Sequence, residues 1–590
     1  MNTRILVSVL GVAVFAASAT AQELNRPISA VGAVSVAGDE ERRISVEQYR
    51  DKMAAGWIGQ MAGVGRGGPT EWWAHGEILA EELVPEWKPS KINQFNQDDI
   101  YVEMTFLRTL EEHGFDVSIR QAGIDFANSG YRLWCANLAG RNNLRSGIAP
   151  PDSSHPKFNV SADDIDYQIE ADYSGLIAPG MINVPIELGE KFGRLMNYGD
   201  GMYAGQFVGA MYTEAFFEDD IRNIIESALR SIPAESQYAE MVRDMLAWHE
   251  KNPDDWMKTW QWIEEKYHMK PEYSHGLWEL TQPGSGPDSE RNIDAKLNGA
   301  YILMGLLYGN RDLDQTIVIS MRCGQDSDCN PSNAAGVLCT TLGMKNLPPR
   351  FTSALQRSIT FSFTEYDFDS LLAVCEKLAR QAVVQQGGRI ETDAEGGEVF
   401  AIPILKPRPS ALARSWEPGP VAGSRYTEEE MKAIRPPEKV SYNKNSPRAD
   451  IGRDVEAFAP GWQIRDCGSF VTPGLQEQWG GRVNVLVTHP YRRDEPCVLH
   501  RNIDVPTGKK TFLELTVRHN DRGSWKLVVR ANGKEILGQE VDEYTWQELR
   551  VDLTEYAGNT IELELWNQAV DWRSWRCEAA YWSRIAIESK

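Results

Sequence analysis

The spacing of apolar residues changes once along this chain of 590 residues, and that change limits the folds it can adopt. From about residue 45 to residue 385, apolar side chains recur every three or four positions, as in ISVEQYRDKMAAGWIGQMAG and IDAKLNGAYILMGLLYG. That period is typical of amphipathic and buried helices. No run of alternating strands is visible in this part, so the sequence predicts an all-α domain rather than βαβ units.

After about residue 457 the period becomes two. Segments such as KTFLELTVRHN and NTIELELWNQ alternate apolar with polar residues, and turn signals such as the Ala-Asn-Gly at 531–533 separate them. This pattern predicts an all-β sandwich of jelly-roll type with about eight strands. The sandwich is dense in tryptophan, whose rings either stack on sugars, as in a carbohydrate-binding module, or fill the core, which is the commoner use.

Residues 386–456 separate the two patterns. Their first part, GGRIETDAEGGEVF, is compatible with a hairpin, and the rest is rich in proline and polar residues. That composition is typical of an extended linker lying on a surface.

The N-terminal stretch MNTRILVSVLGVAVFAASATAQEL has the layout of a cleavable signal peptide. Arg4 supplies the positive charge, a short apolar run follows, and the residues at 19–21 form a small-residue cleavage site. An uncleaved anchor is the alternative, but the apolar run is short for a membrane span. We therefore expect a secreted or periplasmic protein with no membrane span, a signal peptide at 1–21 and an N-terminal extension at 22–44.

The net charge of −23 bears on the partners of the protein, since 84 acidic residues outnumber 61 basic ones. A surface of that sign repels phosphate backbones, so we expect no nucleic-acid partner. The sequence does not indicate an oligomeric state.

Two acidic pairs stand directly before helix-like segments. Asp98 and Asp99 lie in NQFNQDDIYVEMTFL, and Asp326 and Asp328 lie in MRCGQDSDCNPSNAAGVL. Carboxylates at a helix start can cap free N–H groups, and capping alone would explain either pair. If both helix starts converge, however, four carboxylates meet, and a hard cation such as Mg²⁺, Mn²⁺ or Ca²⁺ is needed to make that arrangement tolerable.

These segments resemble motifs of the ADP-ribosylglycohydrolase family. The resemblance covers roughly residues 45–385, and its motifs here are GWIGQMAG…TEWW at 56–73, NQDDIY at 96–101 and CGQDSDCNPSNAAGVL at 323–338. It implies an all-α catalytic domain with a binuclear Mg²⁺-type centre at the bottom of a cleft. The metal ligands that it implies are Gln97, Asp98, Asp99, Asp326 and Asp328.

Two of the positions at which the family has metal ligands depart from its pattern. Gln97 and Cys329 each stand where the family has a ligand threonine. An amide oxygen can still coordinate, whereas a thiol is a poor Mg²⁺ ligand. The departures leave open whether one metal site is altered, shifted to Ca²⁺ or lost.

The chemistry of the site follows from the carboxylates. Cleavage of a glycosidic bond passes through an oxocarbenium-like state and uses carboxylates, and a metal ion can hold substrate hydroxyls and orient a water. Glu71, as acid or base, and Asp99 are the candidate catalytic residues. Asp172 and Asp200 are candidates for substrate binding in the cleft wall, with a plain surface carboxylate as the alternative for each.

We therefore expect a multidomain chain: a helical catalytic domain at 45–385, a hairpin and linker at 386–456, and a sandwich resembling a carbohydrate-binding module at 457–590. The expected function is metal-assisted hydrolysis of a glycosidic bond in an extracellular glycan or glycoconjugate. An ADP-ribosyl hydrolase and a non-catalytic carbohydrate-binding protein are the alternatives. The four retained aspartates argue against the last, since a dead site does not need mutually repelling carboxylates.

Overall fold

The computed structural model describes residues 40–268, 270, 272–273, 292–436, 451–468, 471, 473–570 and 577–590. The predicted signal peptide lies outside the described residues, as do Trp572 and Trp575 of the sandwich. Among the helices of the described ranges, none is both long enough and apolar enough to cross a membrane.

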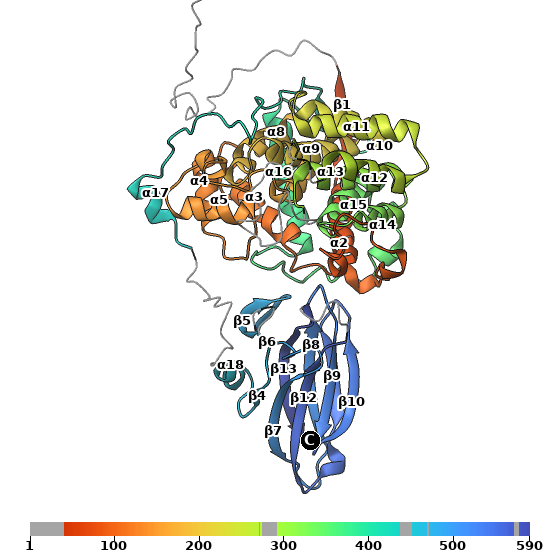
Figure 1. Cartoon of the computed structure of the whole chain (residues 1–590), viewed down its shortest axis with the longest axis vertical. Coiled ribbons are helices and arrows are strands. Elements are labelled where there is room, and N and C mark those ends of the chain that lie inside the picture. Colours follow the sequence, from red (N-terminus) through yellow and green to blue (C-terminus); the bar gives the residue numbers. More distant parts are fainter. Residues whose placement is uncertain are drawn as a thin grey trace, which may run out of the picture. The chain divides into compact units, whose positions relative to one another are not determined.

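The first part of the chain folds into helices, which confirms the predicted all-α domain (Figure 1). The helices are α2 (Val46–Gly67), α3 (Asp98–His113), α4 (Ile119–Ala127), α5 (Ala136–Arg145), α6 (Asp166–Ile169), α7 (Asp172–Leu176), α8 (Asn183–Lys191), α9 (Asp200–Ala215), α10 (Ile221–Ala228), α11 (Gln237–Lys251), α12 (Trp256–Tyr267), α13 (Ala295–Tyr308), α14 (Leu313–Arg322), α15 (Cys329–Leu342) and α16 (Phe368–Gln385). Helices α9 and α13 are buried along their whole length and lie in the middle of this helical unit. Because all their faces pack on other helices, neither has a polar side.

Helices α2 and α15 pack with their backbones in contact. A Cβ atom added to Gly59 would lie 2.3 Å from the carbonyl oxygen of Ala335, and one added to Gly63 would lie 2.3 Å from that of Pro331. At Gly67 the nearest atom would be the carbonyl oxygen of Ser327, only 2.0 Å away. Real Cβ atoms do not approach that closely, so glycine is required along this face of α2. The packing fixes the start of α15 beside the end of α2.

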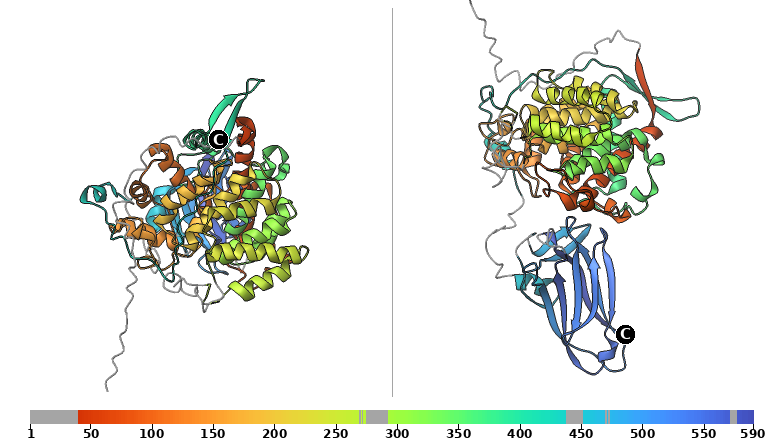
Figure 2. Two further views of the ribbon diagram at one scale, coloured as in Figure 1. Left: turned by 90° about the horizontal axis from the view of Figure 1, so that it is seen from above. Right: turned by 45° about the vertical axis from the view of Figure 1, so that its right-hand side comes forward.

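A small three-stranded sheet joins the ends of the helical unit. Strand β2 (Arg389–Thr392) forms an antiparallel hairpin with β3 (Glu398–Pro403), and β1 (Glu41–Ser45) pairs with the other edge of β3. The hairpin projects from the helical unit next to β1 (Figure 2). Sequence reasoning anticipated the hairpin but not β1, because β1 depends on a partner more than 350 residues away.

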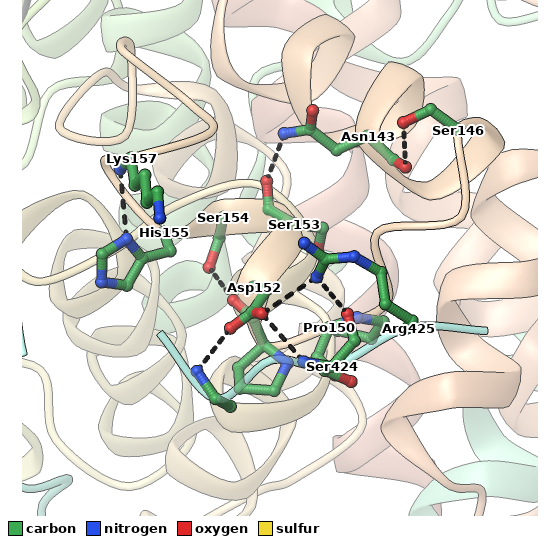
Figure 3. Close-up of polar contacts among 12 residues, drawn as sticks. Asn143, Ser146, Pro150, Asp152, Ser153, Ser154, His155, Lys157, Ser424 and Arg425 are labelled. Atoms are coloured by element: carbon green, nitrogen blue, oxygen red, sulfur yellow. Dashed lines mark hydrogen bonds and ion pairs between the residues drawn. The ribbon is translucent and has the colours of Figure 1, made fainter. Parts of the chain in front are cut away.

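The linker after β3 is held to the helical unit by buried side chains. The carboxylate of Asp152 accepts hydrogen bonds from the backbone N–H groups of Ala422 (2.8 Å) and Ser424 (2.9 Å). It also pairs with the guanidinium of Arg425 at 3.2 Å (Figure 3). Farther along, α17 (Glu428–Ala433) is fixed by an ion pair between Glu430 and Arg120. As far as residue 436, where the description of this segment ends, the linker therefore follows a defined path on the helical unit.

The last part of the chain forms two five-stranded antiparallel sheets, which confirms the predicted sandwich. Their orders are β10-β9-β12-β7-β4 and β11-β8-β13-β6-β5. The elements are α18 (Ile451–Phe458), β4 (Gln463–Arg465), β5 (Gly474–Trp479), β6 (Arg482–Thr488), β7 (Cys497–Asp504), β8 (Thr511–His519), β9 (Trp525–Ala531), β10 (Lys534–Val541), β11 (Gln547–Asp552), β12 (Thr560–Gln568) and β13 (Ala580–Ser589). The prediction of about eight strands was too low, since β4 and β5 are edge strands without clear alternation.

Most tryptophans of the described sandwich fill its core. Trp462, Trp525 and Trp582 are at most 2% exposed and belong to one hydrophobic cluster, whereas Trp546 and Trp566 are half-buried. Val455 of α18 packs into the same cluster. The core therefore begins a few residues before the change of period, in a short helix.

The contact between α2 and α15 can be tested with Gly63→Ala. The added methyl group meets the carbonyl oxygen of Pro331, so we expect the free energy of unfolding to fall by about 1–3 kcal/mol. Urea unfolding followed by circular dichroism measures the effect. Gly452→Ala is the matched control, because a Cβ there meets no atom within 4 Å; it should be neutral or stabilising. Equal stability of Gly63→Ala and the wild type would contradict this account.

Candidate active site

Two helix starts carry the predicted acidic pairs. Asp98 and Asp99 lie in the first turn of α3, and Asp328 is the N-cap residue directly before α15. Among the described residues, neither Gln97 nor Asp328 caps its own helix through its side chain. Both oxygens of Asp99 also lack a hydrogen-bond partner in the described part of the chain, although this side chain is only 1% exposed. Helix capping therefore does not explain these carboxylates.

The structure brings the four predicted aspartates together. Burial raises the pKa of Asp99 well above its usual range, and the charges of Asp328, Asp98 and Asp326 raise it further. Burial and then the neighbouring Glu71 raise the pKa of Asp326 to about 7. A carboxylate oxygen of Asp326, a carboxylate oxygen of Asp328 and the Sγ atom of Cys329 all lie within 4.8 Å of one another. Such mutual repulsion in a buried site requires protons or a cation.

The donor set fits a hard divalent cation. Asp99 offers two buried oxygens with no hydrogen bond from the described residues, and the other aspartates add further oxygens, as Mg²⁺, Mn²⁺ and Ca²⁺ prefer. Cys329 is different. Burial and then Asp326 raise the pKa of its thiol well above the usual range, and its Sγ lies 3.8 Å from Oδ1 of Asp328 as a hydrogen-bond donor. A neutral thiol is a poor ligand, so we place Cys329 beside the oxygen ligands and not among them.

Gln97 holds the position immediately before α3. It is 4% exposed, and its backbone oxygen accepts from the N–H groups of Ile100 (3.1 Å) and Tyr101 (3.0 Å). A Cβ added to Gly68 would lie 3.6 Å from its side-chain nitrogen. The residue is therefore next to the cluster, and its role as a ligand stays a prediction.

Glu71 lies at the edge of the aspartate cluster, after the 3₁₀ turn Gly68–Thr70. Its Oε1 accepts a hydrogen bond of 2.6 Å from Nε1 of Trp72, and its Oε2 forms an ion pair of 2.5 Å with Arg522. Burial raises its pKa to about 8, against the opposing effect of the guanidinium. One oxygen therefore accepts a hydrogen bond, and the other lies beside a positive charge without a hydrogen bond from the described residues, while burial favours a proton near neutral pH.

Two indole rings border the carboxylates. Trp134 donates from Nε1 to Oδ2 of Asp98 at 2.6 Å, as Trp72 does to Glu71. Both half-buried rings pack against a small apolar cluster of Cys135 and Ile293. Aromatic faces beside polar groups are the usual means of holding a ring-shaped ligand.

Sequence reasoning missed Trp134 and Arg522. Trp134 belongs to a loop before α5 whose sequence, YRLWCANL, carries no motif. Arg522 lies in the turn between β8 and β9 of the sandwich, and its other terminal nitrogen lies 3.8 Å from Oδ2 of Asp328. No local pattern could have indicated a contact with residues about 200 and 450 positions away.

The two predicted substrate-binding carboxylates lie in the core. Asp172 accepts from the side-chain amide of Asn333 at 2.7 Å, and Asp200 accepts from the backbone N–H of Tyr238 at 3.0 Å. Lys296 is the main positive charge acting on Asp200. Both aspartates are at most 2% exposed, so the alternative of a plain surface carboxylate is wrong for each. Their role in substrate binding stays a prediction.

Comparison with known proteins identifies the helical unit. A family model described as ADP-ribosylglycohydrolase matches residues 45–388. A solved structure described as an "ADP-ribosylglycohydrolase-related protein complex" is 14% identical, with 57% of this chain and 100% of that chain covered. Its TM-score of 0.34 is too low to carry an argument. The search of curated proteins found no match. The family model covers more than half of the chain and includes both acidic helix starts, and the chain therefore belongs to the ADP-ribosylglycohydrolase family.

Proposed function

We propose that this protein is an exported hydrolase that cleaves a glycosidic bond in a glycan or glycoconjugate with the help of a divalent cation, Mg²⁺ in the first place. One observation carries the proposal: the buried carboxylate of Asp99, which accepts no hydrogen bond from the described residues, lies among three other aspartates. Family membership supports a hydrolase of glycosyl bonds. The predicted signal peptide and the sandwich support a substrate outside the cytoplasm.

The aspartates and Glu71 have separate tasks in this proposal. Asp98, Asp99, Asp326 and Asp328 would hold the cation, which supplies charge stabilisation and orients substrate hydroxyls when bound. Neither oxygen of Asp99 accepts a hydrogen bond from the described residues, so it can bind through one and accept a hydrogen bond from the attacking water through the other. Trp72 and Arg522 stabilise the carboxylate form of Glu71, which can take a proton from that water. Because burial raises its pKa to about 8, this form is the minor one at pH 7 and becomes more abundant as the pH rises towards 8.

The surroundings of the carboxylates support a cyclic substrate. Trp72 and Trp134 are half-buried, and each uses its indole N–H on a carboxylate, which fixes the orientation of the ring. A fixed aromatic face can stack on the apolar face of a sugar at little entropic cost. The exposed guanidinium of Arg132, 3.7 Å from the centre of the Trp134 ring, adds a positive charge at this border.

The function is tested with a panel of glycans, aryl glycosides and an ADP-ribosylated peptide, each incubated with and without EDTA. We expect release of a sugar from a glycan that stops when EDTA removes the cation and returns with added Mg²⁺. Release of ADP-ribose alone would favour an ADP-ribosyl hydrolase. No release with Mg²⁺, Mn²⁺ or Ca²⁺ present would contradict the proposal.

The variant Asp328→Asn tests the cation ligands. It removes a charge where the carboxylates converge, so we expect affinity for Mn²⁺ to fall by at least about 100-fold and turnover to be lost. Titration calorimetry measures the affinity, and circular dichroism checks that the helices remain. The control is Asp219→Asn, which alters a carboxylate that is 65% exposed. Wild-type turnover in Asp328→Asn would contradict the proposal.

The buried carboxylates also predict how stability depends on pH. The pKa of Asp326 is raised from 3.8 to about 7 and that of Glu71 from 4.5 to about 8, in both cases mainly by burial. A raised pKa in the folded state means that stability is fully present below the unfolded value and is lost as pH rises through the folded value. The cation-free protein should therefore melt at a lower temperature at pH 8 than at pH 5.

Saturating Mg²⁺ should reduce this difference, because the cation replaces the protons between the carboxylates. Differential scanning fluorimetry at pH 5, 6, 7 and 8, with EDTA or Mg²⁺, measures it. The same series on Asp328→Asn should show a smaller effect of Mg²⁺. A melting temperature that does not change with pH in EDTA would show that the cluster is not buried as described.

A further inference from the structure

We propose that Arg522 is a positioning residue of the active site, so that the β-sandwich completes the site of the helical unit. The inference rests on the proposed function for the reaction that is affected. The contact itself and its effect on cation binding do not depend on the substrate.

The guanidinium of Arg522 spans two parts of the candidate site. One terminal nitrogen lies 2.5 Å from Oε2 of Glu71, and the other lies 3.8 Å from Oδ2 of Asp328. The side chains of the two acids are 11% and 2% exposed, so the ion pairs are largely shielded from water. The guanidinium therefore adds a positive charge between the two acids, and its planar shape restricts where that charge can lie.

The two oxygens of Glu71 are held by contacts of different origin. Trp72, the next residue in the chain, donates a hydrogen bond to Oε1, whereas Arg522 of the sandwich attracts Oε2 through an ion pair that lacks hydrogen-bond geometry. Without the guanidinium, Glu71 keeps one donor and can rotate about its remaining hydrogen bond. A misplaced proton acceptor lowers the rate of the chemical step more than it lowers substrate affinity.

The turn that carries Arg522 is itself rigid. The backbone N–H of Arg522 donates to Oδ1 of Asn520 at 3.0 Å, and the N–H of Gly523 donates to the backbone oxygen of Asn520 at 3.2 Å. The hydroxyl of Tyr544 donates to the backbone oxygen of Asp521 at 3.1 Å. These bonds hold the turn at both ends, so the guanidinium is presented by a fixed backbone.

The same turn is attached to the segment that leads into α3. Arg518 pairs with Asp521 at 2.7 Å and donates to the backbone oxygen of Asn93 at 3.3 Å, and both charged side chains are buried. Beside it, Lys88 pairs with Asp542, and Ser90 donates to Glu543. The residues that these contacts hold on the helical side, 88–93, end five positions before Asp98, the first residue of α3. These contacts therefore attach the turn that carries Arg522 to the segment before the candidate site.

The test compares Arg522→Gln, Arg522→Lys and the control Arg584→Gln, which removes an exposed arginine of the same sandwich. In Arg522→Gln we expect kcat to fall roughly 10- to 100-fold with KM changed by less than about twofold. Arg522→Lys should restore part of kcat, and Arg584→Gln should match the wild type. In the double variant that also carries Glu71→Gln, kcat should be no lower than in Glu71→Gln alone, because both substitutions break the same contact.

A second readout needs no substrate. Removal of a positive charge beside the cluster should tighten Mn²⁺ binding by about tenfold in Arg522→Gln, measured by titration calorimetry. A general loss of structure would weaken binding instead, so the direction separates the two explanations. If Arg522→Gln does not fold, the same cycle with Arg522→Lys, which keeps the charge but not the planar fork, provides the comparison.

The outcomes distinguish this proposal from the proposed function. Wild-type kcat and Mn²⁺ affinity in Arg522→Gln would overturn the role of Arg522 and leave the hydrolase proposal standing. If no glycan is cleaved but Mn²⁺ binding tightens, the proposed substrate fails and the placement of Arg522 holds. If the wild type binds no Mn²⁺, both proposals fail.

Discussion

The repulsion among buried carboxylates at the starts of α3 and α15 is the constraint on which the rest of the structure depends. Burial raises the pKa of all three of Asp99, Asp326 and Asp328; Asp328 and Asp326 raise that of Asp99 further, and Asp326 raises that of Asp328. The fold keeps them close by force of packing. The glycine face of α2 brings its backbone against α15, and a larger residue at Gly67 would push directly on the backbone beside Asp328. The close contact between α2 and α15 thus helps to hold the repelling carboxylates near one another.

The periodicity of the sequence was enough to predict the two classes of structure, since burial on one face of a helix or strand leaves a regular trace. It was not enough for elements that depend on distant partners. Strand β1 is short, and it forms as a strand by pairing with β3. Strand β4 has three residues and lies at a sheet edge, so it shows no alternation. Pairing between remote segments leaves no local signal.

The same distinction applies to the residues of the candidate site: those in local motifs could be predicted, and those brought in by distant segments could not. The aspartates were found because each pair stands before a well-patterned helix and because the motifs resemble a family. Trp134 and Arg522 were missed, since each reaches the carboxylates through a loop or turn whose sequence has no distinctive pattern. Asp172 and Asp200 are a different case. The sequence could not show that both carboxylates are buried, where Asp172 accepts a hydrogen bond from Asn333 and Asp200 accepts one from the backbone of Tyr238; their role in substrate binding stays a prediction.

The ion pair between Glu71 and Arg522 has a consequence for the history of the chain. A sandwich attached merely to bring an enzyme near its substrate could be exchanged for another without loss. Here the helical unit supplies the acidic side chain and the sandwich supplies its positive partner. A substitution at either residue therefore leaves the other charge unpaired. The two domains should be inherited together, and relatives that lack the sandwich must balance Glu71 with a cation from their own helices or do without that carboxylate.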